Sequence, residues 1–417
     1  MSARPPDVLV VGAGPAGATA ARTLAVAGAR VRLLDRARFP RNKPCGGAIS
    51  MRVLGRFPYL APALGRIPTH RLSKLHLESP GGHSILVQSP SPAALMIRRI
   101  DFDALLVQLA VEAGVELVEG AEITQARTTD AGVELKTRAG DVFAAPHVIA
   151  ADGVYSVVAR RLGINPGWRR TAVALDMMEE TPNDVLASVD PETLWVAYGY
   201  GGSEGYSYVF PKRDHVNVGI GYVLDYFREK IGRSPYDLQA SFVDALRTRG
   251  VLAGRSSRAH FTPYQIPVAG PLRTTATDRV VLAGDAGGFV NGITAEGIYY
   301  AMVTGDLGGR AIAGAGAQTF ERLWRDEIGG ELRDSVLVQR DLLTTPERID
   351  RLIRAAHGAP TVAALIVRYA MGEVSYATAR RRLIFGSPMA ALRLTLRHLR
   401  GIHRPAAHAS AGESRAL

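Results

Sequence analysis

Three glycines near the start of the chain have the spacing that lets a backbone bind a pyrophosphate. Gly12, Gly14 and Gly17 form a Gly-x-Gly-x-x-Gly pattern directly after the apolar run 8–11. The first glycine allows a tight turn, the second lets the backbone approach a phosphate, and the third lets a helix pack close to the strand. The N-terminus of that helix offers free N–H groups and a favourable dipole to anionic oxygens. The pattern predicts a dinucleotide site.

The segments around these glycines complete a βαβ unit. The small-residue segment 16–27 predicts a helix, and a second strand is expected over 29–34. That strand closes on Asp35, which is placed to accept hydrogen bonds from a ribose. Strand, helix, second strand and terminal acid together are far more specific than the glycines alone, for which a turn without a ligand is the alternative.

Two further motifs follow apolar runs later in the chain. Asp152, with Gly153 and Ser156, follows the run 148–151, and Gly284 with Asp285 follows the run 280–283. With three such fingerprints in this order, the chain resembles the flavoprotein family that includes aromatic hydroxylases and geranylgeranyl reductases. The resemblance implies that the dinucleotide is FAD and that Asp285 accepts from a ribityl hydroxyl. It also implies that residues 296–298 open a helix whose N–H groups face the flavin's pyrimidine carbonyls.

Other stretches narrow the resemblance to the geranylgeranyl reductases. They are residues 41–47, residues 205–212 with the later Gly-x-Gly at 219–221, residues 288–305, and the Arg-x-x-Phe-Asp stretch 99–103. Tyr208 stands where the family usually has Trp, a departure that could alter the fit to chain length. The resemblance runs from residue 7 to about residue 310.

The resemblance implies two sets of site residues. The cofactor-binding set is Gly12, Gly14, Pro15, Ala16, Gly17, Asp35, Arg36, Cys45, Gly46, Ala48, Arg99, Ile123, Asp152, Gly284, Asp285, Gly297 and Ile298. The substrate-tunnel set is Tyr206, Tyr208, Phe210, Pro211, Gly219 and Gly221. Aromatic walls suit a polyprenyl chain, which brings binding energy from many buried methylenes. Ordinary strand core is the alternative for each aromatic residue taken singly.

The single cysteine, Cys45, is predicted to lie on a loop because a proline and two glycines flank it. The family places it near the flavin ring, and a thiol near its usual pKa of ~8.5 could donate a proton. A structural small residue is an equal alternative, so its catalytic role is a hypothesis. One cysteine excludes intramolecular disulfides and cysteine metal clusters, which favours a cytoplasmic protein. The ten histidines lack ligand spacing, so no metal site is expected.

The periodicity predicts an α/β fold, α+β overall. A discontinuous Rossmann-type FAD-binding domain is expected over 1–69, 96–165 and 272–318, with an inserted antiparallel-sheet substrate domain over 70–95 and 166–271. A helical C-terminal region is expected over 319–405, and a flexible tail over 406–417. A ligand would then lie between the two domains.

The net charge of +11 suggests an anionic partner. Late arginines lie among apolar residues: Arg380, Arg381, Arg382, Arg393, Arg397, Arg400 and Arg404. No nucleic-acid motif accompanies them, so no nucleic-acid partner is expected. The segment favours an anionic membrane surface, with a solvated helical face as the alternative. Because no transmembrane-length apolar run or signal peptide is present, the expected localisation is cytoplasmic, peripheral on the inner face of the membrane.

The leading functional hypothesis is an FAD-dependent reductase that saturates C=C bonds of a geranylgeranyl or longer polyprenyl group by hydride transfer from reduced flavin. Candidate carriers of that isoprenoid are a prenyl lipid, a menaquinone tail and a chlorophyll-type pigment. An FAD-dependent aromatic or polyketide monooxygenase or halogenase of the same fold is the alternative, and an electron-transfer flavoprotein is a third class. Because no second dinucleotide motif is visible, NADPH and reduced ferredoxin both stay open as electron donors.

Overall fold

A computed structural model describes residues 6–200, 205–342, 345–374, 378–379 and 381–382. The chain divides into two compact units, Met1–Glu373 and Val374–Leu417. Every element below belongs to the first unit. The domain boundaries expected from the sequence within this unit stay a prediction.

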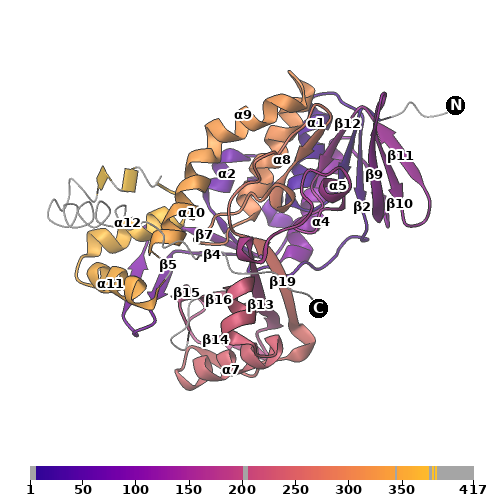
Figure 1. Cartoon of the computed structure of the whole chain (residues 1–417). Helices are drawn as coiled ribbons and strands as arrows, with labels where there is room; N and C mark the ends of the chain where they lie inside the picture. Colours follow the sequence, from indigo (N-terminus) through magenta and orange to yellow (C-terminus); the bar gives the residue numbers. More distant parts are fainter. Residues whose placement is uncertain (1–5, 201–204, 343–344, 375–377, 380, 383–417) are drawn as a thin grey trace, which may run out of the picture. The chain divides into compact units, whose positions relative to one another are not determined.

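A five-stranded parallel sheet lies at the centre of the nucleotide-binding part (Figure 1). Its order is β20 (Val280–Leu282), β12 (His147–Ala150), β1 (Val8–Val11), β2 (Val31–Asp35) and β8 (Glu116–Glu119). Every neighbouring pair is parallel. The inner strands are almost wholly apolar because both faces of the sheet are covered.

Three long helices cover one face of this sheet. They are α1 (Pro15–Val26), α4 (Arg99–Glu112) and α8 (Ile298–Ala313), and their buried side chains share one core with alternate residues of β1 and β2. The other face packs on a three-stranded sheet and a short helix. These elements are β9 (Ile123–Thr129), β10 (Gly132–Thr137), β11 (Val142–Ala145) and α5 (Val157–Arg161).

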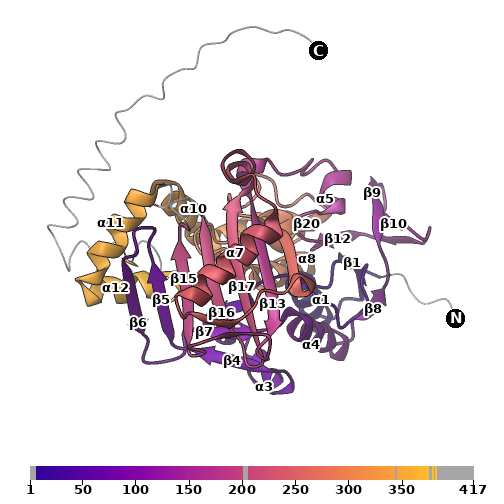
Figure 2. The same ribbon diagram turned by 90° about the horizontal axis from the view of Figure 1, so that it is seen from below.

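A seven-stranded sheet forms the second large layer (Figure 2). Its order is β19 (Phe261–Pro267), β13 (Val173–Pro182), β17 (His215–Val223), β16 (Tyr206–Pro211), β15 (Thr193–Tyr198), β5 (Lys74–Glu78) and β6 (Ser84–Gln88). The predicted antiparallel arrangement holds at every pairing except β15 with β5, which is parallel. No hairpin dictates the direction of that pair, because the nucleotide-binding part of the chain separates the two strands.

The two faces of this sheet bury different partners because side chains alternate along each strand. Trp195 and Val209 pack on α7 (Pro235–Thr248), chiefly through Phe242. Their neighbours Tyr208 and Phe210 point to the opposite face, as part of a separate apolar cluster. The sequence predicted an antiparallel sheet over this region and did not anticipate α7.

Two small sheets and several short helices connect these layers. The sheets are β3 (Ala48–Ser50) with β7 (Ala94–Ile97) and β4 (Thr69–Leu72), and β14 (Leu186–Ser188) with β18 (Leu252–Gly254). The short helices are α2 (Arg52–Arg56), α3 (Leu60–Ala63) and α6 (Leu224–Tyr226). Thus β7 pairs with both β3 and β4, and neither β4 nor β7 joins the large sheet.

The chain after residue 319 is helical, as expected, as far as it is described. Its helices are α9 (Phe320–Trp324), α10 (Gly330–Leu342), α11 (Pro346–His357) and α12 (Pro360–Ala370). Pro346 and Pro360 each begin a helix, where a missing N–H costs nothing. The part of the predicted helical region beyond residue 382 and the whole tail 406–417 lie outside the described residues.

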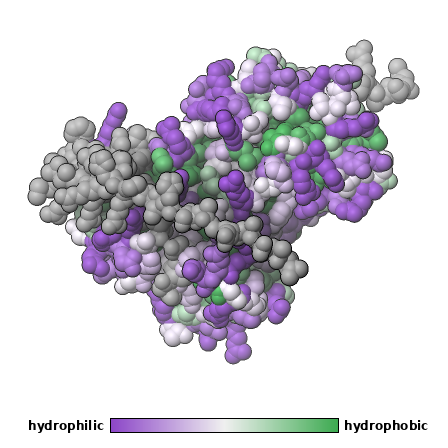
Figure 3. Space-filling view, in the orientation of Figure 1, coloured by the Kyte–Doolittle hydropathy of each residue, from purple (hydrophilic) through white to green (hydrophobic). Residues whose placement is uncertain are grey.

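We find no helix within the described part of the chain that is long and apolar enough to cross a membrane. On the face shown in Figure 3, hydrophilic side chains surround smaller hydrophobic areas. The basic residues that prompted the membrane hypothesis lie, apart from Arg381 and Arg382, outside the described residues.

Candidate active site

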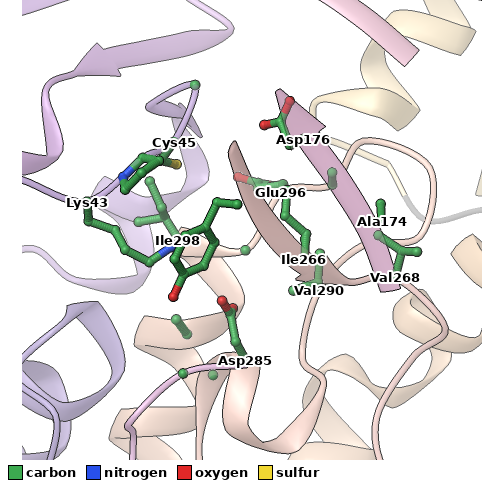
Figure 4. Close-up of a pocket in the computed structure, with 18 of the residues that line it drawn as sticks. Lys43, Cys45, Ala174, Asp176, Ile266, Val268, Asp285, Val290, Glu296 and Ile298 are labelled. Carbon is green, nitrogen blue, oxygen red and sulfur yellow. The ribbon is translucent and has the colours of Figure 1, made fainter. Parts of the chain in front are cut away.

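One cavity of about 710 Å³ extends from the parallel sheet to the seven-stranded sheet. Its first part lies at the carboxyl ends of β1, β2, β12 and β20, where open α/β sheets bind their ligands. Its second part is lined by residues of β5, β13, β15, β16 and β17. Figure 4 shows side chains from several of these segments facing the same space.

Each of the three glycines at the turn between β1 and α1 is required for a different structural reason. Gly12 has φ +92°, and a Cβ there would lie 2.4 Å from the carbonyl oxygen of Ala151. A Cβ at Gly17 would lie 1.8 Å from the oxygen of Gly12, so this glycine closes the turn beneath the helix. Gly14 is different: the nearest atom to its Cβ would be in the Arg41 guanidinium, 3.6 Å away, because it faces the cavity. Gly14 thus leaves room for a ligand.

The N-terminus of α1 opens toward that cavity without a capping group. Across the described residues, no side chain caps the helix at Gly14 and its first turn carries no acid. The first N–H groups of a helix need partners from outside it. An anionic ligand in the cavity satisfies them and gains from the helix dipole.

Asp35 ties the second strand to this turn. It is buried at the end of β2, and its Oδ2 accepts a hydrogen bond of 2.6 Å from the N–H of Ala13. Its Oδ1 accepts from Ala37 at 2.8 Å. Each carboxylate oxygen has a second lone pair, so the predicted bond from Asp35 to a ribose stays open.

Asp152 caps a helix with one carboxylate oxygen and leaves the other without a partner among the described residues. Its Oδ2 accepts from the N–H groups of Val157 at 2.8 Å and Val158 at 3.2 Å, which caps α5. Its Oδ1 is buried and finds no hydrogen-bond partner in the described chain. Burial raises the pKa of Asp152. The lone oxygen on the cavity wall therefore calls for a polar ligand group.

The loop before α8 aims the N-terminus of that helix into the cavity. Asn291 Oδ1 accepts from the N–H groups of Ile293 at 2.9 Å and Thr294 at 3.1 Å. Ala295 has φ 54°, the one positive value at a non-glycine residue in the described ranges, which marks a strained backbone. Gly297 occupies the N-cap position of α8 without a side-chain cap, and a Cβ there would lie 3.5 Å from Asp285 Oδ1.

Glu296 secures this loop from the other side of the cavity. Its Oε1 accepts from the N–H of Ser50 at 2.9 Å, and Arg52 lies 3.6 Å from Oε2. Burial raises the pKa of Glu296, against the nearby charge of Arg52. Sequence reasoning quoted this residue in a motif and did not place it in the site.

Two cations meet at the loop 41–47: the buried Arg99, and the half-buried Lys43 of the loop itself. Arg99 donates two 2.7 Å bonds to Asp103, which also pairs with Arg41 at 2.9 Å. Burial lowers the pKa of Arg99, but Asp103 outweighs it and keeps the pKa above its ordinary value. Lys43 lies 3.7 Å from the ring centroid of Tyr264. Burial, and then the charge of Arg99, lower its pKa.

The second part of the cavity is apolar and aromatic. The ring centroids of Tyr208 and Phe210 lie 4.3 Å apart, and those of Tyr206 and Tyr208 lie 5.6 Å apart. A Cβ at Gly46 would lie 2.8 Å from the Phe210 ring, so the cysteine loop rests directly on this wall. Leu75, Leu77, Leu194, Val196 and Tyr198 extend it.

Most of the predicted site residues meet at this cavity. From the cofactor-binding set, Gly12, Gly14, Pro15, Ala16, Asp35, Arg36, Cys45, Gly46, Ala48, Arg99, Ile123, Asp152, Gly284, Asp285, Gly297 and Ile298 line it. From the tunnel set, Tyr206, Tyr208, Phe210 and Gly221 line it. Their roles toward a ligand stay predictions.

Three of the predicted site residues do not line the cavity. Gly17 lies beneath the turn, against Gly12. Gly219 lies behind Tyr208, where a Cβ would come 2.4 Å from the phenol. Pro211 ends β16 opposite Val216, past the aromatic wall. Gly17 and Gly219 allow close packing, which is a structural contribution.

Sequence reasoning missed several lining residues. Lys43 and Glu296 stood inside quoted motifs, and Asp176 stood as a lone acid in the apolar run 173–178. That lone acid was the available signal for Asp176. Residues from α10 and the end of α12, among them Gln339 and Met371, gave none, because only tertiary packing brings them to the cavity.

The residues present fit FAD. A pyrophosphate, a ribityl chain and the polar edge of a flavin ring all need polar partners. The cavity offers such partners at the open side of Gly14, the uncapped start of α1, the free Oδ1 of Asp152 and the start of α8. A family model described as FAD binding domain matches residues 6–303. The chain therefore belongs to this family of FAD-binding flavoproteins.

Comparisons with individual proteins narrow the family. The chain is 31% identical over 369 residues to digeranylgeranylglycerophospholipid reductase 1 of Methanothermobacter thermautotrophicus, covering 81% of this chain and 87% of that protein. It is 28% identical over 337 residues to menaquinone reductase of Mycobacterium tuberculosis, covering 76% and 78%. A crystal structure of a geranylgeranyl bacteriochlorophyll reductase-like protein from Thermoplasma acidophilum shares the fold, with a TM-score of 0.76 at 21% identity over 91% of this chain and 98% of that one. The protein is a member of the geranylgeranyl reductase family.

Proposed function

We propose that this protein is an FAD-dependent reductase that saturates C=C bonds of a geranylgeranyl or longer polyprenyl chain. The observation that carries the proposal is the continuity of one cavity. It runs from the starts of α1 and α8 to the wall of Tyr206, Tyr208 and Phe210. A polyprenyl chain in the apolar part gains about 0.8 kcal/mol for each buried methylene, which holds a double bond beside the cofactor-binding part.

In this proposal the two helix starts and the carboxylate of Asp285 hold the cofactor. The turn 12–16 and the start of α1 bind the pyrophosphate, Asp285 the ribityl chain, and residues 297–298 the polar edge of the ring. Bound and reduced, FAD supplies a hydride to one carbon of the double bond. The chain's own task is to align the alkene, exclude water and deliver a proton.

The apolar wall supports the first two tasks. Leu194, Val196 and Phe210 present apolar surface around the middle of the polyprenyl chain. Cys45, on the loop above Phe210, is the predicted residue that positions the substrate or donates the proton. Turnover by Cys45→Ser at the wild-type rate would remove it from the mechanism.

We further propose that the polyprenyl chain belongs to a lipid carrier, either a prenyl lipid, a menaquinone tail or a chlorophyll-type pigment. The names of the relatives support this class of substrate. Electrons come from NADPH or from a reduced ferredoxin. Stopped-flow reduction of the flavin with each donor separates the two.

Access to such a lipid is proposed to occur at a membrane surface on the inner face. The net charge of +11 supports binding to anionic lipid. Sedimentation with vesicles tests it: binding to vesicles that contain anionic lipid, and none to zwitterionic vesicles, is expected. Equal binding to both would contradict the electrostatic part.

The decisive experiment is anaerobic. The purified yellow protein is reduced chemically, mixed with a geranylgeranyl substrate and the lipid is analysed by mass spectrometry. A stepwise gain of two hydrogens per double bond is expected. No gain with fully reduced flavin and several carriers would contradict the proposal, and a gain of oxygen or halogen on repeating the reaction in air would point to the monooxygenase or halogenase class.

A further inference from the structure

A carboxylic acid lies in the aromatic wall of the cavity, where nothing in the predicted site required one. Asp176 is on β13, is 7% exposed and lines the cavity. Tyr208 Oη donates a hydrogen bond of 3.1 Å to its Oδ2. Its Oδ1 is buried, and the described residues offer that oxygen no hydrogen-bond partner. Figure 4 shows Asp176 facing the same pocket as Cys45.

The surroundings of Asp176 favour its neutral form. The titratable groups around it are Tyr206 and Tyr208 on β16, Tyr264 at its register position on β19, and Cys45 and Lys43 on the cysteine loop. Burial raises the pKa of Asp176 to about 7, against the opposing effects of the Tyr208 hydrogen bond and the Lys43 charge. Asp176 therefore carries a proton over much of the range up to neutral pH.

The proton has one place to reside. Since Oδ2 accepts from Tyr208, the acidic hydrogen sits on Oδ1. Burial, and then the charge of Asp176, raise the pKa of Tyr208 well above 10, so the phenol remains a donor and keeps Oδ2 as the acceptor. Tyr208 thus orients the O–H bond of Asp176.

Oδ1 of Asp176 faces a glycine on β17 that also lines the cavity. Asp176 pairs with Gly221, and a Cβ at Gly221 would lie 3.8 Å from Oδ1. Gly221 therefore places no side chain of its own over this oxygen, on the side where it lines the cavity.

We propose that Asp176 is the catalytic residue that protonates the substrate double bond, with Tyr208 as its positioning residue; this inference rests on the proposed reductase function. The π bond breaks, the Oδ1–H bond of Asp176 breaks, and its proton forms a C–H bond at one alkene carbon. The hydride from reduced flavin forms a C–H bond at the other carbon. The carboxylate that remains lies near the Lys43 cation, which stabilises it until it takes a proton from solvent.

The first test compares two variants in which an amide replaces a buried acid of β13. Asp176→Asn removes the proton. Glu179→Gln is the matched control, because Glu179 is equally buried but accepts from Ser257 at 2.7 Å, outside the cavity lining. With substrate added anaerobically to reduced protein, flavin oxidation is expected to slow at least ~100-fold in Asp176→Asn. In Glu179→Gln it is expected to stay near the wild-type rate.

A second readout needs no turnover. Infrared spectroscopy of the substrate-free protein is expected to show a protonated carboxyl band that titrates near pH 7. Asp176→Asn loses this band and Glu179→Gln keeps it. In wild-type protein the hydrogen bond from Tyr208 lowers the pKa of Asp176. Tyr208→Phe removes this bond, so the midpoint of the band is expected to shift upward. In wild-type protein the single-turnover rate falls as the pH rises through the same midpoint.

The outcomes distinguish a failure of the role assigned to Asp176 from a failure of the proposed reductase function. Polyprenyl reduction by wild-type protein with an equal rate in Asp176→Asn would overturn the role of Asp176 alone. So would an Asp176 carboxyl that is ionised at pH 5. Loss of proton delivery in Cys45→Ser alone would assign that role to the thiol. If wild-type protein with reduced flavin saturates no polyprenyl chain, the reductase function fails, and this inference fails with it.

Discussion

A Cβ atom on Gly305 would lie 2.1 Å from the carbonyl oxygen of Ala16, so α8 and α1 cross in direct backbone contact. These are the two helices whose uncapped starts face the cavity. The proposed positions of the pyrophosphate and the flavin ring are at the starts of these two helices, so the crossing would set the distance between them. Gly305 does not line the cavity but packs on Ala16, which does.

Gly305→Val should push these helices apart. Because the side chain meets backbone, which cannot rotate away, we expect a loss of about 2–3 kcal/mol in unfolding free energy and weaker FAD retention. Thermal unfolding and flavin per protein measure both. Gly55→Ala is the control, since Gly55 is helical with open space around its Cβ position, and it should be neutral or slightly stabilising. Full flavin in a stable Gly305→Val protein would contradict this account.

Asp285→Ala should weaken FAD binding without unfolding the protein. Asp285 lines the cavity beside Gly297, and the loss of one hydrogen bond to a ribityl hydroxyl raises the Kd for FAD about tenfold. Equilibrium titration of the apoprotein measures it. Asp278→Ala removes an exposed carboxylate on the approach to β20 and should leave the Kd unchanged. A variant that purifies fully yellow with wild-type affinity would show that Asp285 is not a cofactor ligand.

Phe210→Ala should impair lipid turnover more than flavin content. Phe210 is on the cavity face of β16, and its removal takes away apolar contact for the polyprenyl chain. Phe242→Ala is the comparison on the opposite face of the same sheet, and it should cost ~3–5 kcal/mol of stability as a core deletion. Turnover, flavin content and thermal midpoint are measured for both. Equal losses of turnover and flavin in Phe210→Ala would mark it as core.

Asp176→Asn should change how stability depends on pH. A group whose pKa is raised on folding, here from 3.8 to about 7, binds its proton more tightly when folded, so wild-type protein loses stability as the pH rises from 4 to 7. The variant does not show this loss of stability, which is at most about 4 kcal/mol in wild-type protein. Its thermal midpoint relative to wild type should therefore rise between pH 5 and pH 8. A difference that is constant with pH would show that Asp176 is ionised throughout.

Local patterns in the sequence were enough to predict the nucleotide-binding part. Gly12 and Gly17 are required by contacts within one βαβ unit, and the apolar run of β1 reflects a strand buried on both faces. Pro346 and Pro360 mark helix starts through their missing N–H groups. Such signals act over a few residues, and a single sequence displays them directly.

Only the tertiary structure decided how distant segments meet. The parallel pairing of β15 with β5, the covering of the large sheet by α7, and the arrival of α10 and α12 at the cavity have no local signal, because each depends on packing between segments far apart in the chain. Asp176 is the clearest case. Its sequence neighbours are ordinary strand residues, and its hydrogen bond to Tyr208 arises because β17 sets β13 and β16 on either side of itself. The sequence thus determined which cofactor the protein holds, and the packing of the sheet decided which acid lines the cavity beside the cofactor-binding part.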